Sequence, residues 1–217
     1  MPKPTDSQAL FDAVENRRSH YQLSNKSTLS DDQLVALVQR AVKHCPNAFN
    51  IQESRAVIVT GEQHRKLWEK VLETWKPTYN GDVDQEKAAE GQAARFAGGY
   101  GTILFYEDQE IINAMGEKMP YYAKSFPVWS DNSAGMLQFI VWTALAAEGM
   151  GASLQHHGSY SPQTQELATK MFDVPQSWKS TAMMPFGIPT GPPGNPGRPP
   201  KETMFAPIEP RVRTFFG

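Results

Sequence analysis

Two arginines and a serine stand side by side near the start of the chain, at Arg17, Arg18 and Ser19. Guanidinium groups bind phosphate oxygens through paired N–H donors, and a neighbouring hydroxyl adds a third donor. These residue types at this spacing therefore indicate a phosphate site. The alternative is a solvated helix end, because cations are also favourable near the C-terminus of a helix.

An amide-rich stretch, residues 46–55, reads Pro-Asn-Ala-Phe-Asn-Ile-Gln-Glu-Ser-Arg. The side chains of Asn47, Asn50 and Gln52 offer donors and acceptors together, which suits the polar edge of a ring. Residues of this kind also form ordinary turns, so both interpretations stand. We interpret Cys45, just before this stretch, as a packed small side chain, because no Asp/His pair flanks it at a motif spacing.

A third stretch joins a hydrophobic run to a polar strip. Residues 136–147 are apolar on nearly every side, which predicts a buried helix with its cap among residues 130–132. The run is too short to span a bilayer. Glycines end it, and a short extended piece then delivers Gln155, His156 and His157 to the site.

Several familiar kinds of catalytic site are missing from the sequence. It contains no Walker loop, no His-Glu-x-x-His, no Cys-x-x-Cys and no Gly-x-Ser-x-Gly. The adjacent His156 and His157 make a poor chelate, since neighbouring side chains diverge, and we expect no metal site. No catalytic side chain is predicted, so an enzyme built on this chain needs a cofactor to carry the chemistry.

Composition narrows the class of protein. The 217 residues suit a single domain, 1–217, and 21 Lys+Arg against 23 Asp+Glu give a formal net charge of −2. That balance gives no electrostatic case for nucleic acid or an anionic membrane as a partner. The one cysteine excludes an internal disulfide, and the start of the chain has no signal-like apolar region. We therefore expect a cytoplasmic protein.

Hydrophobic periodicity and turn signals predict an α+β fold, with a small sheet wrapped by helices. The predicted helices cover residues 7–18, 30–44, 62–75, 86–96, 136–147 and 163–172, and the predicted strands cover 55–60, 102–106 and 181–184. Residues 107–128 form an excursion whose aromatic side chains can line a substrate pocket or pack on a partner subunit. The aromatic residues of the excursion are Tyr121, Tyr122 and Phe126, and Trp129, just after it, is a further candidate for the pocket.

The end of the chain, residues 189–217, is predicted to be a strap followed by an arm. Prolines crowd its first part, between Pro189 and Pro200. Basic and apolar residues then alternate through Arg211, Arg213 and Phe215, as in a strand. Such an arm can reach across to a neighbouring subunit, or it can fold back on its own chain.

Four separated motifs together resemble the FMN-dependent nitroreductase family. They are the Arg-Arg-Ser-x-Tyr of residues 17–21, the Pro-Asn-Ala-Phe-Asn-Ile-Gln of 46–52, the Gly-Met-Gly-Ala-Ser-Leu-Gln-His of 149–156 and the Met-Pro-Phe-Gly of 184–187. The Val-Trp-Thr-Ala-Leu-Ala and Leu-Gln-His details are similar to the subgroup of fungal fatty-acid-responsive and bacterial copper-induced nitroreductases. The match covers most of the chain, in order.

The resemblance implies a homodimer around a small mixed sheet, with a C-terminal arm that crosses to the partner and FMN at the subunit interface. NAD(P)H and a nitroaromatic or quinone-type oxidant would react there in turn. Arg17 and Ser19 would hold the FMN phosphate, with Arg18 and Tyr21 near the ribityl chain or ring. The other implied FMN contacts are Asn47, Ala48, Asn50 and Gln52 from the partner, Gln155 and His156 at the ring, and Lys201, Arg211 or Arg213 at the phosphate.

The sequence also departs from the family pattern. Asn47 stands where a serine is usual, and Ile51 and Glu53 replace smaller polar residues. These departures leave the oxidant open. Two alternatives therefore stand beside the oxidoreductase: a non-catalytic FMN-binding stress or regulatory protein, and a flavin-degrading enzyme of related fold.

Overall fold

The computed structural model describes residues 7–157, 161–194, 199–208 and 211–216. In this part of the chain, four strands and seven α-helices follow one another. The helices are α1 Gln8–Asn16, α2 Asp31–His44, α3 Gly61–Trp75, α4 Val83–Ala97, α5 Gln109–Lys118, α6 Phe126–Ala147 and α8 Pro162–Phe172, and the strands are β1 Ser54–Thr60, β2 Gly101–Asp108, β3 Gly151–Ala152 and β4 Trp178–Gly187. The α+β class and the three predicted strands are confirmed.

The sheet has the order β1-β2-β4-β3, and each of these three pairings is antiparallel. We expected a mixed sheet, and that detail is wrong for the strands described. The helical hairpin of α3 and α4 returns the chain to the end of the sheet that it left, so β2 runs against β1. A parallel pairing occurs among these residues only as an isolated bridge between Ser19 and Ala152.

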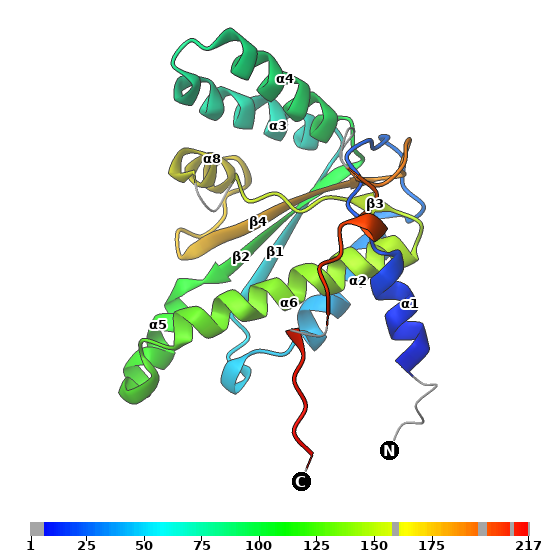
Figure 1. The fold of residues 1–217 in the computed structure, drawn as a ribbon. Helices are drawn as coiled ribbons and strands as arrows, with labels where there is room; N and C mark the ends of the chain where they lie inside the picture. Colours follow the sequence, from blue (N-terminus) through cyan, green and yellow to red (C-terminus); the bar gives the residue numbers. More distant parts are fainter. Residues whose placement is uncertain (1–6, 158–160, 195–198, 209–210, 217) are drawn as a thin grey trace.

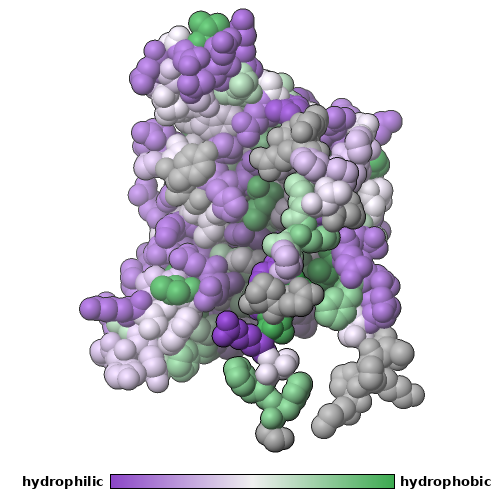
Figure 2. All heavy atoms as spheres, in the orientation of Figure 1, coloured by the Kyte–Doolittle hydropathy of each residue, from purple (hydrophilic) through white to green (hydrophobic). Residues whose placement is uncertain are grey.

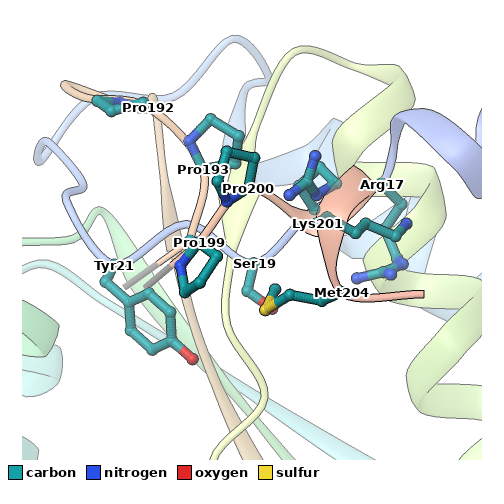
Figure 3. A pocket seen from close by; sticks show the side chains of 11 residues that line it. Arg17, Ser19, Tyr21, Pro192, Pro193, Pro199, Pro200, Lys201 and Met204 are labelled. Carbon is teal, nitrogen blue, oxygen red and sulfur yellow. The ribbon is translucent and has the colours of Figure 1, made fainter. Parts of the chain in front are cut away.

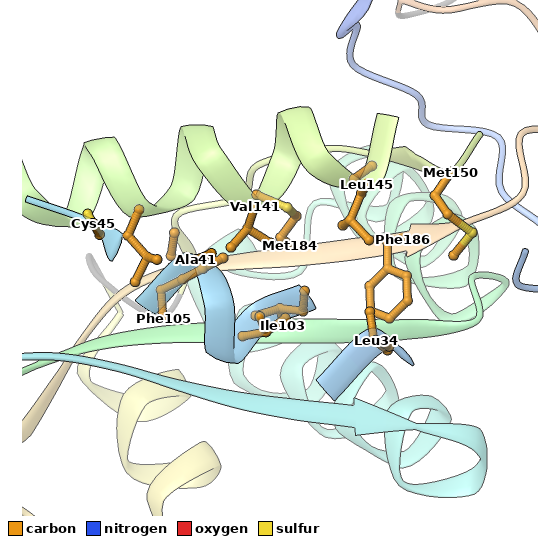
Figure 4. Close-up of a cluster of buried hydrophobic side chains, with 14 residues drawn as sticks. Leu34, Ala41, Cys45, Ile103, Phe105, Val141, Leu145, Met150, Met184 and Phe186 are labelled. Carbon is orange, nitrogen blue, oxygen red and sulfur yellow. The ribbon is translucent and has the colours of Figure 1, made fainter. Parts of the chain in front are cut away.

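Helices cover both faces of the sheet. Figure 1 shows α2 and α6 on one face and α3, α4 and α8 on the other. Every residue of β2 is buried, as expected for a strand covered on both sides. Leu145 of α6, Leu34 of α2 and Phe186 of β4 meet in the core of the first face (Figure 4). The second core centres on Trp68, Phe96 and other side chains beneath α3 and α4.

The central helix is longer than predicted. It begins at Phe126, with Pro127 in its first turn, rather than after a cap at residues 130–132. Ser130 resembles a cap in the sequence, but its hydroxyl donates instead to the buried carboxylate of Glu107, at 2.7 Å. The excursion at 107–128 is therefore largely helical, since it contains α5 and the first turn of α6. No helix of the described chain is long and apolar enough to cross a membrane.

The two ends of the chain pack less than the sequence predicts. Helix α1 ends at Asn16, and its expected buried face is open, with Leu10 60% and Phe11 53% exposed. The described tail residues 211–216 form no strand, and Phe215 and Phe216 are more than nine-tenths exposed. In Figure 2 the end of the tail appears as hydrophobic atoms that project from the body. Residues 211–216 therefore do not contribute to the core of their own chain.

Candidate functional site

A cavity of about 490 Å³ opens where the start of the chain meets the proline strap. Arg17 and Lys201 lie on one side of this cationic cavity, Tyr21 and Pro199 lie on the other, and Ser19 lies between them (Figure 3). Its full lining is Arg17, Arg18, Ser19, Tyr21, Pro192, Pro193, Gly194, Pro199, Pro200, Lys201 and Met204. The structure thus brings together the predicted phosphate-binding residues, and it adds the strap as a wall.

Backbone pairing fixes the donors of the cationic cavity in place. After α1 ends, the backbone N–H of His20 donates to the carbonyl of Ala152 in β3, at 2.9 Å. The carbonyl of Ser19 accepts from the N–H of Gly194 in the strap, at 2.8 Å. A side chain at Gly151 would come within 2.8 Å of Cβ of His20, so glycine is needed where these two segments cross.

The cationic cavity gathers three basic side chains, Arg17, Arg18 and Lys201, around one space. Burial, and then the charge of Arg18, lower the pKa of Arg17. Arg17 Nε is buried and has no hydrogen-bond partner among the described residues. Guanidinium groups stay charged in proteins, so this arrangement favours an anion as ligand. Two guanidinium groups, an ammonium and a hydroxyl around one space are a donor set that fits a phosphate monoester.

A second, polar hollow of about 290 Å³ lies at the far end of the chain segment that follows β3. The segment runs from Ala152 beside Ser19 to His156, which lines this hollow together with Gln138 and Thr181. The backbone of Gln155 exchanges hydrogen bonds with that of Met183, at 2.8 and 2.7 Å. Four extended residues span about 13 Å. Segment 152–156, about 13 Å long, therefore runs from the strand next to Ser19 to the polar hollow.

The two adjacent histidines diverge, as predicted. His156 lines the polar hollow, whereas the ring of His157 lies against Trp75 of α3, with centroids 4.2 Å apart. The described residues contain no group of three or more His, Cys, Asp or Glu side chains that could hold a metal ion.

The amide-rich loop lies at a different cavity. Ala48–Asn50 form a 3₁₀ helix. Phe49, Asn50 and Gln52 all have positive φ, which is uncommon for residues other than glycine. Asn47 and Ala48 line an apolar cavity of about 450 Å³ together with residues of α6. This lining shares no residue with the cationic cavity, so one chain does not bring together the two halves of the predicted site.

The aromatic residues predicted for a substrate pocket form one cluster around Phe49. Its ring centroid lies 5.8 Å from that of Tyr122, 5.7 Å from Phe126 and 5.9 Å from Trp129. Tyr121 is 90% exposed and packs edge-on against Tyr122. Phe126 is fully buried and supports the cluster, whereas Phe49 and Tyr121 are exposed and Tyr122 and Trp129 are half-buried.

Of the three basic residues proposed near the phosphate, Lys201 alone lines the cationic cavity. Arg211 instead donates to the tail carbonyls of Pro207 and Ala206, at 3.1 and 2.9 Å. The lining of the cationic cavity does not include Arg213 either.

Sequence reasoning missed a pair of buried acids. Glu53 is 0% and Glu107 2% exposed, and Glu107 accepts hydrogen bonds from Ser54 at 3.0 Å and Ser130 at 2.7 Å. The pKa of Glu107 is raised to about 7, chiefly by burial and in part by the nearby Glu53, although the hydrogen bonds from Ser130 and Ser54 lower it. Neither carboxylate oxygen of Glu53 has a partner in the part of the chain described. We call these two residues the acid cluster. Neither residue lines any of the three cavities described above.

The same buried environment explains why the thiol of Cys45 stays protonated. Burial raises the pKa of its thiol to about 11, and Glu107 and Glu53 add to the effect. The thiol lies 3.6 Å from the carbonyl of Ser133. A thiol that stays protonated is a poor nucleophile, which agrees with its predicted role as a packed residue.

Comparison with known proteins places the chain. HBN1 of Saccharomyces cerevisiae, described as a putative nitroreductase, is 35% identical over 173 residues, which is 80% of this chain and 82% of that protein. The nitroreductase CinD of Lactococcus lactis, in complex with nicotinic acid, is 34% identical with a TM-score of 0.77, covering 91% of this chain and 98% of CinD.

A more distant structure shares the fold alone. The FMN-dependent nitroreductase NfnB of Mycobacterium smegmatis, in complex with NADPH, is 12% identical with a TM-score of 0.70, over 97% of this chain and 99% of NfnB. The sequence model of the nitroreductase family matches residues 14–188, which include both the cationic cavity's arginines and the last strand of the sheet. The chain therefore belongs to the nitroreductase family.

Proposed function

We propose that this protein is an FMN-dependent oxidoreductase that takes reducing equivalents from NAD(P)H and passes them to nitroaromatic or quinone-type acceptors. The cationic cavity carries the proposal, because its half-buried Arg17 has a buried Nε with no hydrogen-bond partner among the described residues. Bound FMN would supply the redox chemistry, and the protein would supply binding, orientation and electrostatics.

The geometry supports a division of labour along one chain. Arg17, Ser19 and Lys201 would hold the phosphate, and Arg18 and Tyr21 would flank the ribityl chain. Segment 152–156 leads from that end to the polar hollow, so Gln155 and His156 would border the flavin ring. A span of about 13 Å along this segment suits a ligand with an anionic end and a distant ring.

We further propose that a second copy of the chain completes each site. Asn47, Ala48, Asn50 and Gln52 would reach the flavin from the partner, since their loop lies away from the cationic cavity of its own chain. The exposed tail, with Arg211, Arg213 and Phe215, would cross to that partner as an arm. Its apolar side chains are otherwise in contact with water, which is unfavourable for a large exposed patch.

Two small molecules would then bind in turn beside the same ring. The solved complexes of CinD contain nicotinic acid and 4-nitrophenol, and that of NfnB contains NADPH. In this chain, Tyr121, Tyr122 and Trp129 present an exposed aromatic surface that suits flat acceptors, with Phe126 as its support.

A spectroscopic experiment tests the proposal. Purified protein, reconstituted with FMN and desalted, should be yellow with one flavin per chain. Under nitrogen, NADPH or NADH should bleach the absorbance, and 4-nitrophenol or a quinone should restore it. A protein that remains colourless after reconstitution contradicts FMN binding.

Controls separate the main proposal from the non-catalytic alternative. A yellow protein that neither nicotinamide bleaches supports an FMN-binding regulator and contradicts the oxidoreductase. Arg65→Ala, which removes an exposed arginine on α3 outside the cationic cavity, should behave like the wild type. Loss of flavin in that variant would show that retention depends on overall charge rather than on the cavity.

A further inference from the structure

Trp142, on the last turns of α6, lies directly beside the cationic cavity although it is not part of its lining. Cζ of Arg17 lies 4.2 Å from the centroid of the Trp142 ring. The indole Nε1 of the same residue donates to the carbonyl of Ala152, at 3.2 Å. One half-buried side chain therefore contacts both the arginine and the strand that borders the site.

The first contact determines how Arg17 meets a ligand. A cation over an indole is attracted by the negative potential on the face of the neutral ring, and the attraction grows when the pair is desolvated. With one face against Trp142, the guanidinium offers a ligand its in-plane N–H groups. Those groups bind two oxygens of a phosphate at once.

The second contact fixes the position of that arginine relative to the ring site. The carbonyl of Ala152 accepts from Trp142 Nε1 and also from the backbone N–H of His20. Ser19 forms an isolated bridge with the same Ala152. The indole thus holds segment 152–156 against the segment that carries Arg17 and Ser19.

We propose that Trp142 is a positioning residue for the phosphate monoester: it orients the Arg17 guanidinium and thereby sets the preference for FMN over riboflavin. This inference rests on the proposed function. Riboflavin has the same ring and ribityl chain but no phosphate, so it reports on the rest of the site alone. The ratio of the riboflavin Kd to the FMN Kd therefore isolates the contribution of Arg17 and its support.

The experiment titrates apoprotein with each flavin and follows the quenching of flavin fluorescence. Trp142→Leu should lower the riboflavin-to-FMN Kd ratio about 10-fold, the size of a partly desolvated cation–π contact. Trp178→Leu is the matched control, since Arg55 lies over that ring at 5.6 Å and neither residue lines the cationic cavity. The control should leave the ratio within about 2-fold of the wild type.

Two further variants test whether the effect passes through Arg17. In an Arg17→Ala background, Trp142→Leu should not change the ratio further, as a double-mutant cycle requires for coupled residues. Trp142→Phe keeps an aromatic face but loses the indole N–H, so both flavins should weaken together at nearly constant ratio. An equal loss of ratio with and without Arg17, or an unchanged ratio in Trp142→Leu, overturns the positioning role.

A measurement without a core substitution covers the case in which Trp142→Leu does not fold. Replacing all tryptophans by 5-fluorotryptophan weakens the negative ring face at nearly constant shape. The ratio should fall about 2-fold to 3-fold in wild-type protein and stay constant in Arg17→Ala; equal behaviour of the two overturns the proposal. A wild type that binds neither flavin defeats the proposed function itself, whereas FMN binding with an unchanged ratio defeats only the role of Trp142.

Discussion

Helix α6 runs beside two groups of like-charged side chains, one near each of its ends. Near its start, Ser130 donates to the acid cluster of Glu53 and Glu107. Near its end, Trp142 lies beside the cationic cavity. These two positions on the helix are about 18 Å apart. Each group has an excess of one charge, yet the two differ in their access to solvent.

That difference decides how each charge is compensated. The acid cluster is sealed, with Glu53 0% and Glu107 2% exposed, so its charge is reduced by holding protons. The cationic cavity is open, and arginine does not lose its proton in proteins. It therefore needs an anion from outside. An open group of like charges indicates a ligand site, whereas a sealed one indicates a structural element that responds to pH.

The largest expected effect comes from removing donors of the cationic cavity. Arg17→Ala combined with Ser19→Ala should raise the Kd for FMN about 100-fold, because two hydrogen bonds to a charged phosphate are lost. Fluorescence titration of apoprotein measures the change, with Arg65→Ala as control. An unchanged FMN affinity would show that the phosphate binds elsewhere, and it would contradict the assignment of the cationic cavity as a ligand site.

The second prediction concerns the effect of the Glu107 charge on stability. Glu107 has a folded pKa of about 7, raised by burial above the value of about 4.3 in unfolded chains. Its contribution to stability is therefore fully present below pH of about 4.3 and is lost as pH rises through 7. Glu107→Gln removes this loss and should raise the free energy of unfolding at pH 8 by about 3 kcal/mol.

Urea unfolding at pH 5 and at pH 8 measures this second effect. Wild type should lose stability between the two conditions, and Glu107→Gln should lose less. The glutamine can still form hydrogen bonds with the hydroxyls of Ser54 and Ser130, which contact Glu107 in the wild type. Equal pH dependence in both proteins would show that Glu107 is ionised in the folded state at neutral pH.

The comparison also explains what the sequence could predict. Arg17, Arg18 and Ser19 are neighbours in the chain, so their residue types alone indicated an anion site. Lys201 could not be selected from Arg211 and Arg213, because only the path of the strap brings it to the cationic cavity. The role of Trp142 could not be predicted either, because an indole within an apolar run is first interpreted as a core residue.

The acid cluster depends even more on three-dimensional structure. Glu53 and Glu107 are brought close by the β1–β2 register, which pairs Ser54 with Glu107. No local pattern encodes that register. The start of α6 was mispredicted through the same residues: Ser130 is a favourable cap by type, but its hydroxyl is used by Glu107. Elements with strong periodicity were predictable, whereas polar contacts between distant segments were not.

Replacing Glu53 gives a smaller and more specific test of how a buried carboxylate in the acid cluster affects stability. Burial raises the pKa of this carboxyl, whereas its own backbone N–H, the Ser133 hydroxyl and the charge of Arg55 lower it; neither oxygen forms a hydrogen bond of good geometry within the described chain. Its contribution is likewise lost as pH rises above the unfolded value. Glu53→Met, of similar volume and without charge, should stabilise the protein by about 1–2 kcal/mol at pH 8 and by less at pH 5. Destabilisation at pH 8 would reveal a partner for the carboxylate.

The smallest expected effect comes from removing the one lysine that lines the cationic cavity. Lys201 is a single point charge on the strap, and its ammonium lies 5.7 Å from the Phe205 ring. Lys201→Ala should therefore raise the FMN Kd by about 5-fold, less than the loss of the bidentate Arg17. The riboflavin Kd should not change, and the dependence of FMN binding on salt should weaken. Lys66→Ala, on the exposed face of α3, is the matched control and should change neither quantity. If both lysine variants weaken FMN equally, the cavity attracts the phosphate through the overall field of the protein rather than through Lys201.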